Sequence, residues 1–265
     1  MPQIRIGTSG WIYRHWRGRF YPETLPQSRW LSHYMTVFDT VEINSSFYHM
    51  PKETAFERWR EAAPDGFLFA VKGSRYVTHL RKLSGVDDAV RAFVERASLL
   101  REHLGPILWQ LPAGLHYSRE RLEALVGCLP PGRRYVLEVR HPSWLAPEAL
   151  SLLRDAGIAF CIADTPVVGG DDPNRRLFPY AEEVTADFVY VRLHGHLALY
   201  ASKYTEEELR SWADKIPAWH RAGLDVFIYF DNDANAYAVI NARRLAELVG
   251  GRGCAGRSAT VERED

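Results

Sequence analysis

The sequence is poor in cysteine. Its three cysteines, Cys128, Cys161 and Cys254, lie far apart, and no two of them form a C-x-x-C pair. An odd and sparse set argues against a disulfide scaffold and against a zinc or iron–sulfur site made of thiolates. We therefore expect reduced thiols in a cytoplasmic protein.

The sequence also lacks an excess of charge of either sign and a long apolar run. Its 33 Lys and Arg residues balance 33 Asp and Glu residues, so no global field favours nucleic acid or a membrane surface. No apolar stretch has the length of a membrane span, and the chain does not open on a charged segment followed by an apolar one. These absences again predict a cytoplasmic protein that does not enter a membrane.

The chain does contain eight short apolar runs, each followed by a helix-like or long connecting segment. The runs cover residues 4–9, 40–44, 67–72, 107–111, 135–140, 159–164, 188–194 and 226–231. The clearest helices are predicted at 53–63, 86–104, 118–128, 147–156, 206–222 and 236–249. Nearly continuous apolar runs are typical of parallel strands covered by helices.

Eight strand–helix units in roughly 250 residues fit a TIM (β/α)8-like barrel. The alternative is an open doubly wound sheet, which is weakened because no glycine-rich phosphate loop follows the first run. The sequence thus predicts a single α/β domain over residues 1–250. Residues 251–265 are small and charged, which predicts a disordered tail.

Two connections are long enough to suggest a function. Residues 10–29 follow the first strand and are rich in aromatic and basic side chains, and residues 165–186 follow the sixth strand. Connections of this length are uncommon in compact domains unless they act as lids or binding loops.

The last residue on one face of every predicted strand is polar. These residues are Ser9, Asn44, Lys72, Gln110, Arg140, Asp164, His194 and Asp231. One step deeper the same face carries Gly7, Glu42, Ala70, Leu108, Glu138, Ile162, Arg192 and Tyr229. In a barrel these positions point inward at the C-terminal end, where active sites are built, although a slip of one residue would reverse a strand's faces.

This pattern predicts a polar pocket with residues for acid/base chemistry. The candidate catalytic residues are Glu42, Glu138, Asp164 and His194, because carboxylates near cations have shifted pKa values. Lys72, Arg140 and Arg192 bring three cations to the same mouth, which suits an anionic ligand group. The structural alternative is a buried ion-pair network in which these charges only balance one another.

Further residues complete the predicted substrate site. They are Trp11, Tyr13, Asn44, Tyr48, Gln110, His141 and Asp231. Trp144, Tyr200 and Tyr204 also follow strand ends, and such aromatic side chains stack on a sugar or a base. Packing of these loops over the barrel is the structural alternative. His79 and His141 are weaker candidates for a general base.

Three functions remain open. The leading hypothesis is an enzyme, a hydrolase or lyase, that acts on a small anionic or sugar-containing molecule. The second is a metal-dependent phosphoesterase or nuclease that acts on nucleic acid. Its metal ligands would be His194 with Asp164, Asp231 and Glu138, but no H-E-x-x-H motif supports a metal and the nearby cations oppose one, so no metal or other cofactor is assigned. The third is a non-catalytic small-molecule binding barrel.

Several motifs together resemble one family. They are GTSGWIY at 7–13, FYP at 20–22, VEINSSFY at 41–48, VKGSRYVTH at 71–79, LWQLPAG at 108–114, LEVRHPSW at 137–144, YVRLHG at 190–195 and YFDND at 229–233. Over residues 4–249 the chain resembles the domain of unknown function 72 family, also called YecE-like. The resemblance implies a TIM-barrel-like fold and no established activity.

Overall fold

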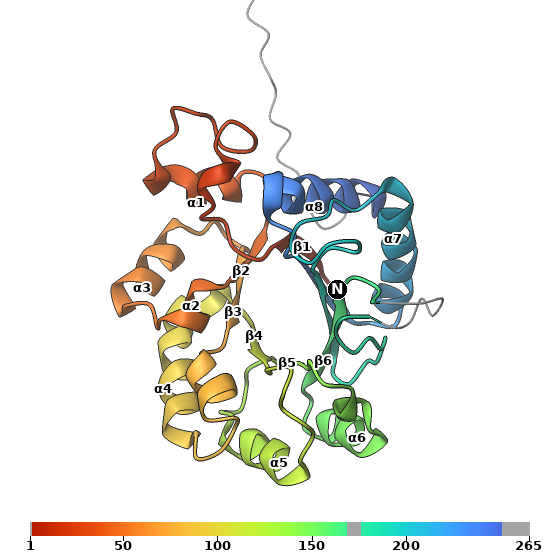
Figure 1. Ribbon diagram of the computed structural model, residues 1–265. Coiled ribbons are helices and arrows are strands. Elements are labelled where there is room, and N and C mark those ends of the chain that lie inside the picture. Colours follow the sequence, from red (N-terminus) through yellow and green to blue (C-terminus); the bar gives the residue numbers. More distant parts are fainter. Residues whose placement is uncertain (1, 169–175, 251–265) are drawn as a thin grey trace, which may run out of the picture.

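The computed structural model describes residues 2–168 and 176–250, which contain eight parallel strands arranged as a nearly closed barrel (Figure 1). The strands are β1 (Ile4–Thr8), β2 (Thr40–Ile43), β3 (Leu68–Lys72), β4 (Leu104–Gln110), β5 (Tyr135–Glu138), β6 (Ala159–Asp164), β7 (Phe188–Leu193) and β8 (Asp225–Phe230). Their order is β1-β8-β7-β6-β5-β4-β3-β2. This arrangement confirms the predicted TIM-like barrel, and all eight predicted strands are present.

The barrel closes where β1 meets β2. A parallel bridge joins Ser9 to Glu42 just beyond the regular ladder. Gly7 lies at the closest approach, because a Cβ atom built there would stand 2.3 Å from the carbonyl oxygen of Thr40. Closure at this seam therefore requires a residue without a side chain.

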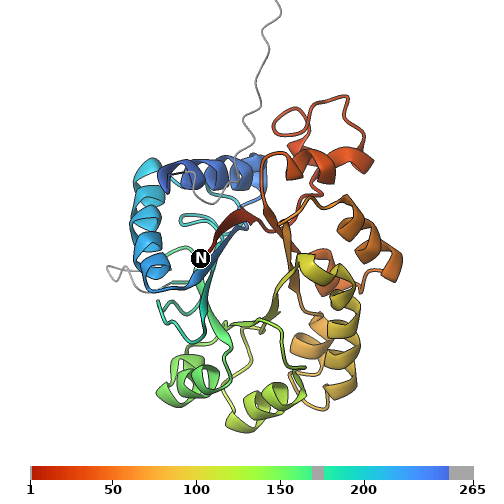
Figure 2. The ribbon, with the colours of Figure 1, turned by 180° about the vertical axis from the view of Figure 1, so that it is seen from behind.

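Helices surround the strands when the barrel is viewed from either end (Figure 1 and Figure 2). They are α1 (Trp30–Met35), α2 (Ser45–Tyr48), α3 (Glu53–Ala62), α4 (Asp87–Ala97), α5 (Arg119–Cys128), α6 (Pro147–Asp155), α7 (Glu206–Arg221) and α8 (Tyr237–Leu248). The two short helices α1 and α2 were not predicted. Within residues 2–168 and 176–250, no helix is long and apolar enough to cross a membrane.

Local sequence signals account for several helix ends. A single helix was predicted over residues 86–104. In the structure the α-helix ends at Ala97, and a 3-10 segment follows in which Arg101 has a φ of 52°. Thr205 and Glu208 form a reciprocal capping box at the start of α7, because each side chain bonds the other residue's backbone N–H. The predicted tail at residues 251–265 lies outside the described residues.

Two layers of apolar side chains flank the strands. The outer layer lies between the strands and the helices. The inner layer fills the lower part of the barrel and comprises Ala70, Leu108, Val136, Ala159, Cys161, Phe188, Tyr190, Phe227 and Tyr229. The charged residues of the mouth lie above this inner layer, so water is excluded from beneath them.

The composition of the inner layer shows that the inward and outward faces of β6 are the reverse of those predicted. Ile162 and Asp164 were predicted to point into the barrel. In the structure Cys161 belongs to the inner layer and Ile162 to the outer layer, so Asp164 faces outward with Ile162. The prediction was wrong because the AFCIA run before Asp164 is apolar on both faces, and alternation then carries no information about direction.

We expect Gly7→Ala to lower the free energy of unfolding by about 1–3 kcal/mol, because the added methyl group overlaps the Thr40 carbonyl at the barrel seam. Urea unfolding measures the loss. Gly127→Ala is the matched control, since Gly127 lies in α5 with nothing within 4 Å of the added carbon. The control should be neutral or stabilising by up to about 1 kcal/mol. Equal effects of the two substitutions would contradict the close approach at Gly7.

Candidate active site

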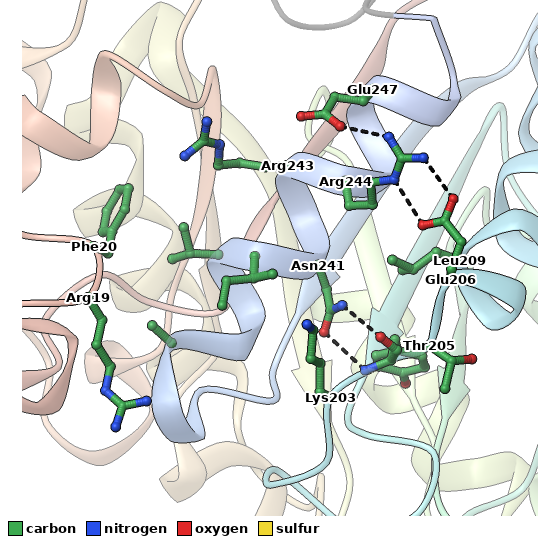
Figure 3. A pocket seen from close by; sticks show the side chains of 14 residues that line it. Arg19, Phe20, Lys203, Thr205, Glu206, Leu209, Asn241, Arg243, Arg244 and Glu247 are labelled. Atoms are coloured by element: carbon green, nitrogen blue, oxygen red, sulfur yellow. Dashed lines mark hydrogen bonds and ion pairs between the residues drawn. The ribbon is translucent and has the colours of Figure 1, made fainter.

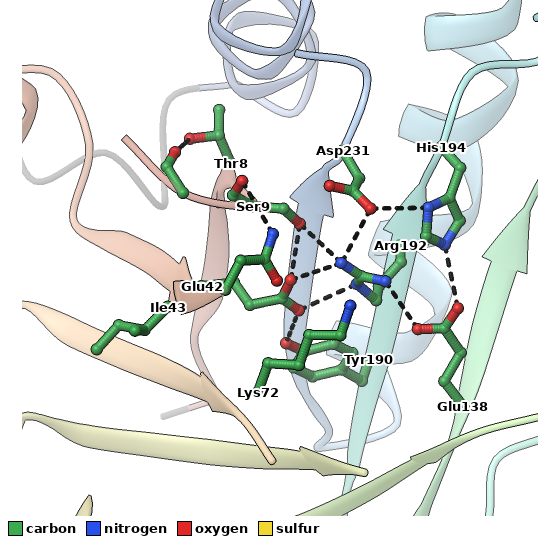
Figure 4. Close-up of polar contacts among 12 residues, drawn as sticks. Thr8, Ser9, Glu42, Ile43, Lys72, Glu138, Tyr190, Arg192, His194 and Asp231 are labelled. Atoms are coloured by element: carbon green, nitrogen blue, oxygen red, sulfur yellow. Dashed lines mark hydrogen bonds and ion pairs between the residues drawn. The ribbon is translucent and has the colours of Figure 1, made fainter. Parts of the chain in front are cut away.

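Arg192, on β7, is the centre of the charged layer at the barrel mouth (Figure 4). Its Nη1 donates to Glu138 Oε2 at 2.8 Å, and its Nη2 donates to Asp231 Oδ2 at 3.0 Å. Its Nε and Nη2 also donate to the two carboxylate oxygens of Glu42, at 3.1 and 2.7 Å. Burial lowers the pKa of Arg192, but the three carboxylates outweigh it and raise the pKa well above its usual value. The side chain is a permanent, fully paired buried cation.

Glu42 is occupied on both oxygens by donors from the barrel interior. Ser9 Oγ donates to Oε1 at 2.8 Å, and Tyr190 Oη donates to Oε2 at 2.6 Å. Together with the bonds from Arg192, these contacts satisfy a side chain that has no exposed surface. The contacts fix the position of the carboxylate and, through it, of Arg192.

His194 lies between two carboxylates. Its Nδ1 is 3.0 Å from Asp231 Oδ2, and its Nε2 is 3.2 Å from Glu138 Oε1. A neutral imidazole has one N–H and can donate to only one of the two. Burial raises the pKa of Glu138, but Arg140, Arg192 and His194 lower it more, and the result lies well below the usual value. Glu138 is therefore an ionised carboxylate at neutral pH.

Arg140 stands above Glu138 and carries nitrogen atoms without an aligned acceptor. Its Nη2 is 2.5 Å from Glu138 Oε1, and its guanidinium carbon lies 3.6 Å from the centroid of the Phe178 ring. Within the described ranges, Arg140 Nε and Nη2, Glu138 Oε1 and His194 Nε2 are buried and form no hydrogen bond of good geometry. Such atoms in a native protein usually bond to water or to a ligand.

Lys72, at the end of β3, is the third cation of the mouth. In Figure 4 its side chain points toward the charged layer. Its Nζ lies 4.5 Å from the centroid of the Phe47 ring, and no side chain in residues 2–168 or 176–250 forms an ion pair or a hydrogen bond with it. Burial and the neighbouring charge of Arg192 lower the pKa of the Lys72 amine to about 8. A substantial fraction of this amine is therefore neutral near physiological pH.

The rim consists of residues that bond mainly to backbone. Tyr13 Oη and Asn44 Nδ2 both donate to the Ser9 carbonyl, at 2.6 and 3.2 Å. Gln110 Nε2 donates to the Leu111 carbonyl at 3.3 Å. Asn44 Oδ1 is buried and has no hydrogen-bond partner among the described residues.

Two histidines lie beside the cations. His141 stacks on His116 with 3.8 Å between ring centroids, and its Nδ1 accepts from the Ser143 backbone N–H. Burial and the charge of Lys72 lower the pKa of His79 to about 4. At neutral pH His79 is therefore an uncharged imidazole.

Asp164 is not part of this cluster, which corrects its predicted place in the pocket. Its Oδ2 accepts a hydrogen bond from Tyr204 Oη at 2.6 Å, and its Oδ1 pairs with Arg176. Trp11 also lies away from the mouth, in the outer apolar layer, where it packs edge-on against Trp59 at 5.5 Å between centroids. Asp164 ends β6 and Trp11 follows β1, but both side chains point toward the surrounding helices and away from the barrel interior.

Two other predicted aromatic side chains also miss the cluster. Tyr48 is 62% exposed and contacts Phe47 edge-on. Trp144 is buried in the outer layer, where its Nε1 donates to the Leu115 carbonyl. Tyr200 does reach the mouth, with its ring centroid 5.6 Å from that of His194.

The structure adds residues that the sequence did not single out. Tyr190 supports Glu42 from the inner layer, and Phe178 stacks on Arg140 from the connection after β6. The unusual length of that connection was the signal for Phe178. Tyr190 gave no signal, because an aromatic residue in an apolar strand is ordinary core.

The cluster does not fit the metal site that the phosphoesterase or nuclease hypothesis would need. Within the described residues, no group of three or more His, Cys, Asp and Glu side chains could hold a metal ion. The carboxylates nearest His194 already pair with Arg192, and Asp164 points away. Guanidinium groups in these positions repel a second cation.

We expect Asp231→Asn to lower the free energy of unfolding by about 2 kcal/mol at neutral pH. Burial raises the pKa of Asp231, but Arg192 and His194 lower it from 3.8 to about 2. Because this pKa is lower in the folded than in the unfolded state, the stabilisation is present above about pH 4 and is lost as the pH falls toward 2. Urea unfolding at several pH values should show the gap between wild type and variant closing over this range.

Asp214→Asn is the control for this series, because Asp214 is an exposed residue of α7. It should match the wild type at every pH. A gap for Asp231→Asn that stayed constant down to pH 2 would contradict the ion pair with Arg192.

The comparisons with known proteins agree with this architecture. The chain is 25% identical to the UPF0759 protein YunF of Bacillus subtilis (strain 168), over 93% of this chain and 94% of YunF. It is 29% identical to the UPF0759 protein YecE of Escherichia coli (strain K12), over 72% and 75% of the two chains. A crystal structure of a DUF72 family protein from Thermotoga maritima MSB8 is 30% identical, with a TM-score of 0.82 over 93% of this chain and 99% of that one. The model of the family described as "Protein of unknown function DUF72" matches residues 5–263, and the chain belongs to this family.

Proposed function

We propose that the barrel mouth is the active site of an enzyme that uses acid/base chemistry on a small anionic or sugar-containing substrate. One observation carries the proposal. Four buried polar atoms on Glu138, Arg140 and His194 lie together at the C-terminal end of the strands, and three of them contact one another as ion pairs, but none forms a well-aligned hydrogen bond within the described residues. Contacts without good alignment leave hydrogen-bonding capacity for a ligand, and active sites of TIM barrels occupy this end.

Arg140 and Lys72 supply the contacts for an anionic group of the substrate. Arg192 was predicted to share this role, but its guanidinium is committed to three carboxylates. Arg140 Nη2 contacts Glu138 Oε1 at 2.5 Å, but its Nε forms no hydrogen bond with the described residues, and guanidinium N–H groups bind carboxylate or phosphate. We therefore assign Arg192 and Glu42 to positioning the site, and Arg140 to holding the substrate.

Lys72 is the base in this proposal. Its amine has a pKa near 8, and a base with a pKa close to the working pH transfers protons most effectively. The Lys72 nitrogen takes a proton from a C–H or O–H group of the substrate, and the electron pair of the broken bond stays on the substrate beside Arg140. His194 is held between Glu138 and Asp231 and helps to position these carboxylates. Asp164 has no role in this step.

The proposal can be tested without a known substrate. Purified wild-type protein is incubated with a deproteinised cell extract, and mass spectrometry follows the metabolites over time. We expect an anionic compound to be converted, with a rate that rises as the pH rises through about 8, because the neutral fraction of the Lys72 amine increases. Lys72→Gln should slow the conversion by about 10²-fold or more, and Arg140→Gln should raise the substrate concentration needed.

Lys52→Gln is the matched control, because Lys52 is an exposed lysine before α3. It should convert the same compound at the wild-type rate. Conversion that survives Lys72→Gln in a folded protein would overturn the assignment of the base. A compound that co-purifies with the protein and is never converted would instead support a non-catalytic binding barrel.

A further inference from the structure

A cavity lies outside the barrel, beside α8 (Figure 3). Its volume is about 750 Å³, which is within the range of small-molecule sites, roughly 300–1,000 Å³. Three segments form it: the connection after β1, the segment that enters α7, and one face of α8. It is separate from the charged layer at the mouth, because none of the residues bonded to Arg192 lines it.

The cavity has a local excess of positive charge. Four basic residues line it, Arg19, Lys203, Arg243 and Arg244, against two acidic residues, Glu206 and Glu247. Arg244 donates to Glu206 at 2.9 and 2.7 Å and to Glu247 at 2.8 Å, so these three form one network. The other three cations have no acidic partner in the part of the chain that the structure describes. The chain as a whole has no net charge, so the excess of positive charge is a local feature of the residues that line the cavity.

The remaining lining is apolar. Leu209 and Val239 are buried beneath the cavity, and Ile240 is 45% exposed. Phe20 adds an aromatic ring from the connection after β1. A cavity with cations at the rim and apolar side chains on its walls favours a ligand that combines an anionic group with an apolar or planar group.

A strained turn forms one edge of the cavity. Asn235 and Ala236 both have left-handed φ angles, 55° and 60°, although neither is glycine. Trp16 Nε1 donates to the carbonyl of Asp233 at 2.8 Å and holds the start of this turn. Strain of this kind costs of order 1–3 kcal/mol per residue and clusters at ligand-binding sites. The strained turn supports a ligand site independently of the charged residues.

We propose that this cavity binds a phosphomonoester that carries an apolar or planar group. Arg19, Lys203 and Arg243 attract the phosphate, which can accept several N–H groups at once. Phe20, Val239 and Ile240 contact the apolar or planar part. This site does not depend on the function proposed for the barrel mouth.

The test is calorimetric titration of the whole protein with AMP, adenosine and inorganic phosphate at low ionic strength. We expect saturable binding of AMP, weaker binding of each fragment, and loss of affinity as salt is added. Arg243→Glu and Lys203→Glu should each weaken AMP binding about tenfold or more. Both residues are exposed, so the variants should remain folded, and circular dichroism checks that they do.

Two controls locate the site. Lys52→Glu makes the same charge change away from the cavity and should leave AMP binding unchanged. Arg140→Gln, at the barrel mouth, should also leave it unchanged. Absence of saturable AMP binding, or equal affinity in Arg243→Glu and wild type, would overturn the proposal. Loss of binding in Arg140→Gln alone would place the nucleotide at the mouth and would equally overturn it.

Discussion

The structure depends on the burial of one guanidinium group in the barrel. Arg192 has no exposed surface, and a cation there is tolerated only because carboxylates from three other strands surround it. Glu42 comes from β2, Glu138 from β5, and Asp231 follows β8. β8 is the neighbour of β7, which carries Arg192, but β2 and β5 are not, so Glu42 and Glu138 can reach Arg192 only when the sheet curves into a barrel. The ion-pair cluster therefore depends on the closed fold.

The buried Arg192 guanidinium also determines the contacts and the charges of the residues above it. Because Arg192 occupies one oxygen of Glu138, the second oxygen faces Arg140 and His194. Its positive charge also adds to burial in lowering the pKa of Lys72, which has no carboxylate of its own among the described residues. Glu138 thus links the buried pair with Arg192 to the ion pairs with Arg140 and His194 above it. In the proposed function, Arg192 and Glu42 position the site, whereas Arg140 and Lys72 contact the substrate.

Asp164 ends β6, but it takes part in a buried hydrogen-bond network outside the charged cluster of the mouth. Tyr204 Oη donates to Asp164, and the Tyr204 backbone N–H donates to Asn241 Oδ1 at 3.1 Å. Asn232 Nδ2 donates to the same oxygen of Asn241 at 3.0 Å. This buried network ties β6 and the segment after β8 to the entrance of α7 and to α8. It fixes the wall between the barrel mouth and the outer cavity.

Sequence alone determined much of the fold. Apolar runs identified all eight strands, because buried parallel strands are apolar over their whole length. Periodicity and capping residues located the longer helices. The polar residues at the strand ends also identified the inward face of seven strands, and Glu42, Glu138 and Arg192 strengthened the prediction on three of them. On β6 the same argument failed, because the run before Asp164 is apolar on both faces and Asp164 itself points outward.

Only the tertiary structure decided which charges meet. Pairing between residues as distant in the chain as Glu42 and Arg192 depends on strand order and side-chain length, and neither leaves a local signal. The sequence therefore predicted three equivalent cations at the mouth. Among the described residues, the structure instead pairs Arg192 with three carboxylates and Arg140 with Glu138, and it gives Lys72 no ion pair. The cavity beside α8 likewise has no motif, because three segments that are separate in the sequence line it.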